Sequence, residues 1–340
     1  MRDLRRLPKA HLHLHLAGGM RPATLAELAR AQGRRLPPEL LDPAGTRVDL
    51  TARRGWSRFQ RLYDAARDVV QGPAEVRRLV SEIAEDERAA GSGWVEVQVD
   101  PSSYAARLGG LTATVEVVLD AMAAASAATG VGMALVVAAN RTRHPGEAET
   151  LARVAKQYAG SSAGQPRVVG FGLSNDETRG RPEEFAKAFR IAKDAGLLSV
   201  PHAGELRGVR SVRAAVEQLR ADRLGHGVRA VEDVQTMALL ASRGVVLEVC
   251  PASNVALGVA GAVEQVPVRE LKAAGVQVAL GADDPLLFRS GLLDQYAAVR
   301  DQQGLTDPAM ADLARDAVRG SAAPSDVRAR LLAGIDDWLA

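Results

Sequence analysis

The 340-residue sequence contains a single cysteine, Cys250. One cysteine cannot build a disulfide framework or a cysteine-rich zinc site, which is consistent with a reducing compartment. An excess of one charge is also lacking, because 43 lysine and arginine residues face 41 aspartate and glutamate residues. The formal net charge of +2 leaves no basic field, so nucleic acid is not an expected partner.

Targeting and linker signals are absent as well. Arg2, Asp3, Arg5 and Arg6 interrupt the start of the chain, so we predict no signal peptide or membrane-spanning segment and a cytoplasmic protein. No repeat beyond the strand–helix alternation and no low-complexity tract divides the sequence. We therefore predict one domain over residues 1–340.

The stretch 8–16, Pro-Lys-Ala-His-Leu-His-Leu-His-Leu, alternates polar and apolar residues. This period of two predicts a β-strand with His11, His13 and His15 on one face. Imidazole nitrogens need polar partners, so three rings in a row do not suit a dry core. A metal near the end of the strand would satisfy His13 and His15, whereas His11 lies deeper and is expected to be a buried supporting residue.

Short apolar strands alternate with helical patterns along the rest of the chain. This alternation favours a single (β/α)8 TIM barrel, an α/β fold. The rival doubly wound sheet lacks its usual Gly-x-Gly-x-x-Gly turn after the first strand. Helical patterns before the second strand predict a helical cap over about residues 20–90. Strands two to eight are expected at 94–99, 131–138, 167–173, 198–202, 222–226, 245–250 and 276–281.

In such a barrel the active site lies at the carboxyl ends of the strands. Five of the six histidines fall in motifs at these predicted ends. Three imidazoles and a carboxylate suit a borderline ion such as Zn²⁺, which can lower the pKa of a bound water toward neutrality. The predicted ligands of one Zn²⁺ per chain are His13, His15, His202 and Asp283.

Three further residues near these ligands are candidates for catalysis. Glu205 follows His202 closely enough to carry a proton, His226 could orient or deprotonate water, and Asp284 is a free carboxylate. Each motif alone has a plain structural reading, such as a hydrogen-bonded core histidine or an Asx turn before proline. Their placement together at strand ends favours a metal-dependent enzyme.

The motif set resembles the adenosine deaminase family in register along nearly the whole chain. The motifs are Pro8-Lys9-Ala10 before His13-Leu14-His15, His202-Ala203-Gly204-Glu205, Gly225-His226-Gly227, Cys250-Pro251-Ala252-Ser253-Asn254 and Asp283-Asp284-Pro285-Leu286. The resemblance implies a zinc-dependent barrel that hydrolyses the 6-amino group of an adenine ring. It also implies that Glu205 protonates ring N1, His226 handles the attacking water, and Asp284 contacts ring N7.

Two positions depart from the family pattern. Asn175 stands where the family usually has glycine, in a segment whose backbone holds ring N3. Ala17 stands where the family typically has the aspartate that binds the 5′-hydroxyl of ribose. Alanine cannot accept that hydrogen bond, so we expect a 5′-modified adenosine such as 6-aminodeoxyfutalosine, an intermediate of menaquinone biosynthesis, under a cap that contains Trp56 and Phe59.

Other functions stay open at this point. Plain adenosine, giving inosine, and free adenine are the alternative substrates of a deaminase. A metal-dependent hydrolase of another class or an inactive binding relative would use the same barrel, since fold alone does not determine chemistry. The 5′ substituent, the oligomeric state and the ion among Zn, Fe and Mn are not determined by the sequence.

Overall fold

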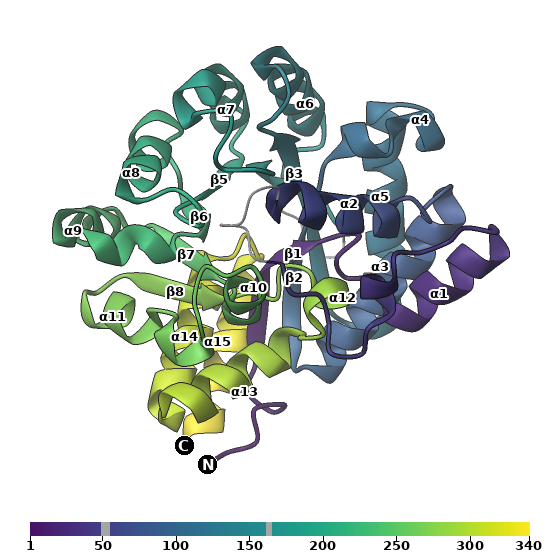
Figure 1. The fold of residues 1–340 in the computed structure, drawn as a ribbon. Coiled ribbons are helices and arrows are strands. Elements are labelled where there is room, and N and C mark those ends of the chain that lie inside the picture. Colours follow the sequence, from purple (N-terminus) through teal and green to yellow (C-terminus); the bar gives the residue numbers. More distant parts are fainter. Residues whose placement is uncertain (49–54, 161–164) are drawn as a thin grey trace.

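The computed structural model describes residues 1–48, 55–160 and 165–340. Eight parallel strands follow one another around a barrel in sequence order, with helices outside them (Figure 1). The predicted (β/α)8 fold is thereby confirmed. The strands are β1 Lys9–His15, β2 Ser92–Val99, β3 Gly132–Asn140, β4 Val168–Ser174, β5 Leu198–Ala203, β6 Arg223–His226, β7 Val246–Val249 and β8 Gln277–Leu280.

The barrel closes between β8 and β1 through the backbone of Asp283. The Asp283 N–H donates to the His13 carbonyl at 3.0 Å, and the His15 N–H donates to the Asp283 carbonyl at 3.0 Å. These two bonds form an isolated parallel bridge between Leu14 and Asp283. The closure therefore places three of the predicted metal ligands on adjoining backbone positions.

Helices cover the outer face of the barrel (Figure 1). Apolar faces at helical spacing bury their aliphatic residues against the strands, as the hydrophobic effect requires. The longer helices after β2 are α5 Leu111–Thr129, α6 Pro145–Gln157, α7 Ala186–Asp194, α8 Val209–Gln218, α9 Val234–Arg243, α13 Leu292–Gln303, α14 Asp307–Gly320 and α15 Ser325–Leu339. Short helices follow other strands: α4 Ala105–Leu108, α10 Pro251–Ala256, α11 Val268–Ala273 and α12 Pro285–Phe288.

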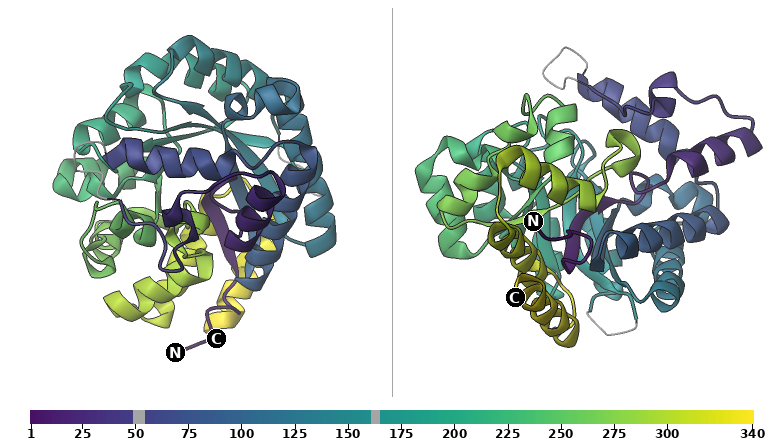
Figure 2. Two further views of the ribbon diagram at one scale, coloured as in Figure 1. Left: turned by 45° about the vertical axis from the view of Figure 1, so that its right-hand side comes forward. Right: turned by 90° about the horizontal axis from the view of Figure 1, so that it is seen from below.

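Between β1 and β2, in the region predicted to form a cap, the described residues form three α-helices. They are α1 Pro22–Ala31, α2 Gly55–Arg67 and α3 Pro73–Ala89. Residues of α2 line the cavity at the strand ends, whereas α3 packs against α5 and β2 on the outside of the barrel. In the right-hand view of Figure 2, α1 and α2 lie at the opposite end of the molecule from α15.

One helix of the described part of the chain, α5, is long and apolar enough by length and composition to cross a membrane. In the structure α5 packs against α3 and β3. Val115, Val118 and Met122 on its inner face are fully buried. Such burial is what a core helix of a barrel shows, and the hydropathy of α5 is explained by it.

Candidate active site

The carboxyl ends of the strands open into a cavity of about 740 Å³ including its mouth. Its floor is formed by residues that follow five different strands, and its roof is formed by α2. The floor residues include His15, Gln98, His202, Glu205, His226, Asp283 and Asp284, and the roof residues are Trp56, Phe59, Gln60, Tyr63 and Arg67. The cavity thus joins most of the residues predicted from the sequence.

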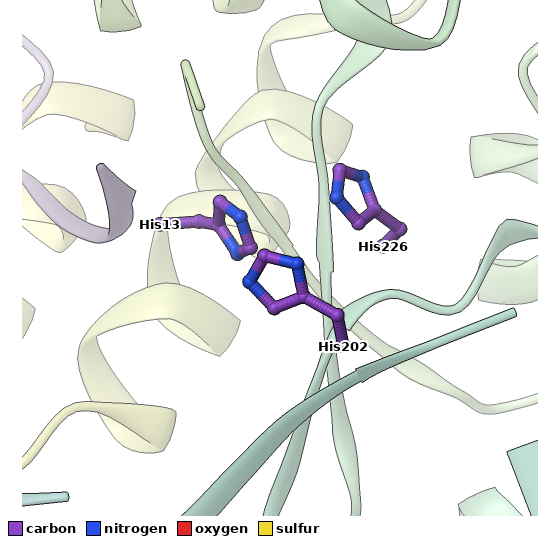
Figure 3. Close-up of side chains that lie close together, drawn as sticks. All are labelled: His13, His202 and His226. Carbon is purple, nitrogen blue, oxygen red and sulfur yellow. The ribbon is translucent and has the colours of Figure 1, made fainter. Parts of the chain in front are cut away.

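Four histidines converge on the floor. The rings of His13, His202 and His226 lie close together although they come from β1, β5 and β6 (Figure 3). Their nitrogens form one group of possible metal ligands, and His13, His15 and Asp283 form a second group. The two groups share His13, so both describe one site rather than two separate ones.

The free atoms of this site fit a divalent cation. His13 Nε2 is buried and has no hydrogen-bond partner among the described residues. Asp283 Oδ1 lies 3.4 Å from His13 Nε2 and 3.2 Å from His15 Nε2, while its other oxygen accepts a hydrogen bond from Ser253 at 2.7 Å. Imidazole nitrogens with one carboxylate oxygen are a donor set that zinc prefers.

A buried chain of charges fixes the ring of His13. Glu248 on β7 lies 2.8 Å from His13 Nδ1, and it accepts a hydrogen bond from Arg223 at 2.6 Å. Arg223 also pairs with Glu96 on β2. A carboxylate on the far nitrogen holds a ligand histidine in one tautomer and orientation. Sequence reasoning did not identify these residues, although a lone acid inside the apolar run 245–250 was a signal.

His11 lies below the cluster as a buried residue, as expected. Its Nδ1 is 2.7 Å from Glu87 Oε1, and its Nε2 accepts a hydrogen bond from the Ala282 N–H at 2.9 Å. His11 therefore supports the backbone next to Asp283 and does not point into the cavity.

Local backbone geometry brings the cluster together. His226 and Asp283 have φ values of 65° and 58°, a left-handed conformation that non-glycine residues rarely adopt. Such strain occurs where the surrounding structure requires it, often at functional sites. A Cβ on Gly225 would come within 2.6 Å of His202 and 2.8 Å of His13, so only glycine allows these two rings to meet.

Glu205 lies on a loop that a second glutamate holds in place. Glu177, after β4, accepts hydrogen bonds from four successive N–H groups, those of residues 204–207, at 2.6–3.0 Å. Burial, together with the negative charges of Asp283 and Glu177, raises the pKa of Glu205 well above its ordinary value. The raised pKa favours the protonated form of the Glu205 carboxyl group, which can donate a proton.

His226 lies next to this acid. Its Nε2 is 3.7 Å from Glu205 Oε1, and burial lowers the pKa of the imidazole to about 4. His226 is therefore neutral at pH 7 and can accept a proton. The site thus places an acid with a raised pKa beside a neutral base, a combination suited to hydrolysis.

Asp284 presents a free oxygen to the cavity. Asp284 is buried, and its Oδ1 has no hydrogen-bond partner in the described part of the chain. Burial and the neighbouring Asp283 raise the pKa of Asp284 well above its ordinary value. A Cβ on Gly18 would lie 1.9 Å from that oxygen, so glycine after β1 leaves room for it.

The remaining predicted site residues are placed differently. Trp56, Phe59 and Asn175 line the cavity. Ala17 does not line it, and its side chain is completely buried in the turn after β1. The described part of that turn therefore places no carboxylate in the cavity.

A closed barrel with clustered histidines and an aspartate at its strand ends defines a metal-dependent amidohydrolase. The adenosine deaminase family model matches residues 8–338, and the chain belongs to that family. A Streptomyces coelicolor protein named as a candidate adenosine/adenine deaminase is 56% identical over 343 residues, 100% of this chain and 98% of the relative.

Two further relatives are adenine deaminases by name. The Rhizobium leguminosarum enzyme is 34% identical and the match covers 96% of this chain and 98% of the relative. The crystal structure of the Arthrobacter aurescens enzyme superimposes with a TM-score of 0.87 at 29% identity, covering 98% of this chain and 99% of that one. The predicted family and enzyme class are confirmed.

Proposed function

We propose that the protein hydrolyses the 6-amino group of adenine and that a zinc ion serves as its cofactor. The observation that carries this proposal is the meeting of Glu205, His226 and the histidine–aspartate cluster in one cavity. The ion would be held by His13, His15, His202 and Asp283, and it would supply a water whose pKa is lowered toward neutrality.

Glu205 and His226 would each carry out part of the proton transfer. Glu205 gives its proton to ring N1 as the water oxygen adds to C6, which keeps the ring neutral while C6 becomes tetrahedral. His226 takes the first proton of the water and returns it to Glu205, 3.7 Å away. The second proton of the water passes to the amino group, and the C6–N bond breaks to release ammonia and hypoxanthine.

Asp284 orients the ring in this scheme. The raised pKa favours the protonated form of its carboxyl group, which would donate a hydrogen bond to ring N7 from the unpartnered oxygen. Glu205 and Asp284 thereby contact a nitrogen on each side of C6: N1, which is bonded to C6 in the six-membered ring, and N7, which lies two bonds away in the five-membered ring.

Free adenine is the substrate that the structure favours. The turn of Ala17 contributes no carboxylate of its own that could bind a ribose 5′-hydroxyl, and relatives that are 34–35% identical over nearly the whole chain are named adenine deaminases. A 5′-modified adenosine such as 6-aminodeoxyfutalosine is the second candidate, since it too lacks that hydroxyl. Adenosine itself ranks third.

A substrate panel tests this order. Loss of absorbance at the adenine band should be followed with adenine, adenosine, 5′-deoxyadenosine, methylthioadenosine and aminodeoxyfutalosine, with ammonia measured in parallel. We expect kcat/KM for adenine to exceed that for adenosine by at least about 10²-fold, a ratio within reach of a site that rejects a substituent. A higher value for aminodeoxyfutalosine would select the second candidate, and no ammonia from any member would refute the deaminase.

The charge chain behind His13 gives a separate prediction. Glu248→Gln retains the shape but weakens the hold on His13, so zinc affinity should fall by about 10–100-fold. Competition with a chelator measures this directly. Glu264→Gln, at an exposed position of the short 3-10 helix Val263–Gln265, is the matched control and should leave zinc affinity unchanged. Equal affinity in Glu248→Gln would mean that the hydrogen bond to His13 has no role in zinc binding.

A further inference from the structure

The roof of the cavity is tied to the barrel at Asn175. Trp56 Nε1 donates to Asn175 Oδ1 at 3.1 Å, and Asn175 Nδ2 donates to Gln60 Oε1 at 2.9 Å. Both partners belong to α2, whereas Asn175 directly follows β4. One side chain thus uses both ends of its amide to join the roof to the barrel.

The backbone conformation of Asn175 indicates that its side chain has a role. Asn175 has a φ of 78°, a conformation that glycine adopts without strain. Asparagine tolerates it better than most residues, yet it still has a Cβ to accommodate. Asparagine at position 175 therefore provides two hydrogen bonds through its side-chain amide, and the left-handed backbone makes it conformationally less favourable there than glycine.

We call the hydrogen bonds of Asn175 to Trp56 and Gln60 the tie. Its position relative to the substrate follows from the proposed function, on which this inference rests. C6 faces the metal cluster, N1 faces Glu205 after β5, and N7 faces Asp284 after β8. Ring atoms N3 and N9 then point away from the cluster, toward the roof. Because β4 is the neighbour of β5, Asn175 lies on the N3 side of this outward edge.

We propose that Asn175 is a specificity-determining residue that holds α2 down over the outward edge of the purine and thereby excludes substituents on N9. A ribose on N9 requires the space between α2 and the end of β4. Making that space breaks the hydrogen bonds of Asn175 to Trp56 and Gln60. Free adenine, which carries only hydrogen at N9, leaves both bonds in place.

The roof keeps other contacts when the tie is lost, so variants of it should fold. The Trp56 and Phe59 rings lie 5.3 Å apart, and Phe59 stacks on Phe288 at 6.2 Å. Asn175→Gly suits the left-handed backbone. Trp56→Phe keeps an aromatic ring and removes only the N–H donor.

The test compares adenine, 9-methyladenine and adenosine as substrates of the wild type, Asn175→Gly and Trp56→Phe. We expect the ratio of kcat/KM for adenosine over adenine to rise by about tenfold in Asn175→Gly, and by less in Trp56→Phe, with 9-methyladenine moving in the same direction. The matched control is Gln32→Ala. Gln32 donates to the Val69 carbonyl at 2.7 Å, a contact between α1 and the end of α2 outside the cavity, and its loss should leave the ratio unchanged.

The outcomes separate this inference from the proposed function. A wild type that prefers adenine, with ratios unmoved in both Asn175→Gly and Trp56→Phe, overturns the role of Asn175 alone. A wild type that prefers adenosine shows that the tie does not exclude a ribose and overturns the inference while deamination stands. Failure to deaminate any of the three compounds overturns the proposed function and this inference with it.

Discussion

Replacing Glu205 with glutamine should reduce kcat/KM for adenine by at least about 10²-fold, the lower range of what a positioned general acid contributes. Glutamine has the shape of a protonated glutamic acid and can still donate a hydrogen bond to N1. It cannot give up the proton, so the ring would carry a negative charge as water adds to C6. Binding of the product hypoxanthine should change much less than turnover.

The raised pKa of Glu205 gives the direction of a pH effect. The acid form is the active one, so kcat/KM of the wild type should fall as pH rises through that pKa. Stopped assays from neutral to alkaline pH measure this limb. The residual activity of Glu205→Gln should lack the limb, because glutamine does not titrate.

A control and a metal measurement complete this experiment. Glu232→Gln removes an exposed carboxylate that pairs with Arg229 at 2.6 Å and should retain wild-type turnover. Metal content of Glu205→Gln should equal that of the wild type, because Glu205 is not a proposed ligand. Near wild-type activity in Glu205→Gln would show that another group protonates the ring.

The strands could be predicted from the sequence because each is a short apolar run between helical patterns. The predicted ranges 131–138 and 198–202 correspond to β3 Gly132–Asn140 and β5 Leu198–Ala203. A closed barrel brings the carboxyl ends of all strands to one side, so the sequence predicts that residues such as His13 and His202 meet.

Other features depend on contacts that sequence patterns do not encode. Glu177 supports the Glu205 loop and Glu248 orients His13, yet each acid alone could be a solvated or capping residue. The tie from Asn175 to α2 joins positions separated by 115 and 119 residues. Only the packing of α2 over the barrel determines that these side chains meet.

The effect of alanine at position 17 differs from the one that the sequence predicts. The missing carboxylate was expected to leave space for a 5′ group. The structure buries Ala17 outside the cavity, so an exchange at this position alters the wall behind the turn after β1. We therefore expect an N9 substituent to be sensed by cavity residues of α2 and by Asn175.

Removal of the metal should have the largest effect of all. Prolonged treatment with a strong chelator should lower turnover by at least about 10³-fold, since metal catalysis contributes several kcal/mol of transition-state stabilisation. Zinc added back in equimolar amount should restore it. Comparison of Zn²⁺, Fe²⁺ and Mn²⁺ in this reconstitution identifies the ion that supports the highest kcat/KM.

Substitution of a ligand separates the metal from other effects of the chelator. His202→Ala removes one of the four proposed ligands and should lower both zinc content and turnover, because three remaining ligands bind more weakly. His144→Ala is the matched control. That histidine is exposed and caps α6 by accepting a hydrogen bond from the Gly146 N–H at 3.1 Å, so its loss should change neither zinc content nor turnover.

The pH dependence of zinc retention distinguishes the histidine site from adventitious binding. Imidazole ligands must be deprotonated to bind zinc, so zinc should be released as pH falls and protons compete with the ion for the ligand nitrogens. Because β1, β5 and β8 are held in the barrel by pairing with neighbouring strands, we expect the far-ultraviolet circular dichroism of the chelated protein to match that of the loaded one. Full turnover in folded protein with no detectable metal would refute the metal site, whereas loss of turnover together with loss of the fold would show that the ion holds the barrel together rather than serving hydrolysis alone.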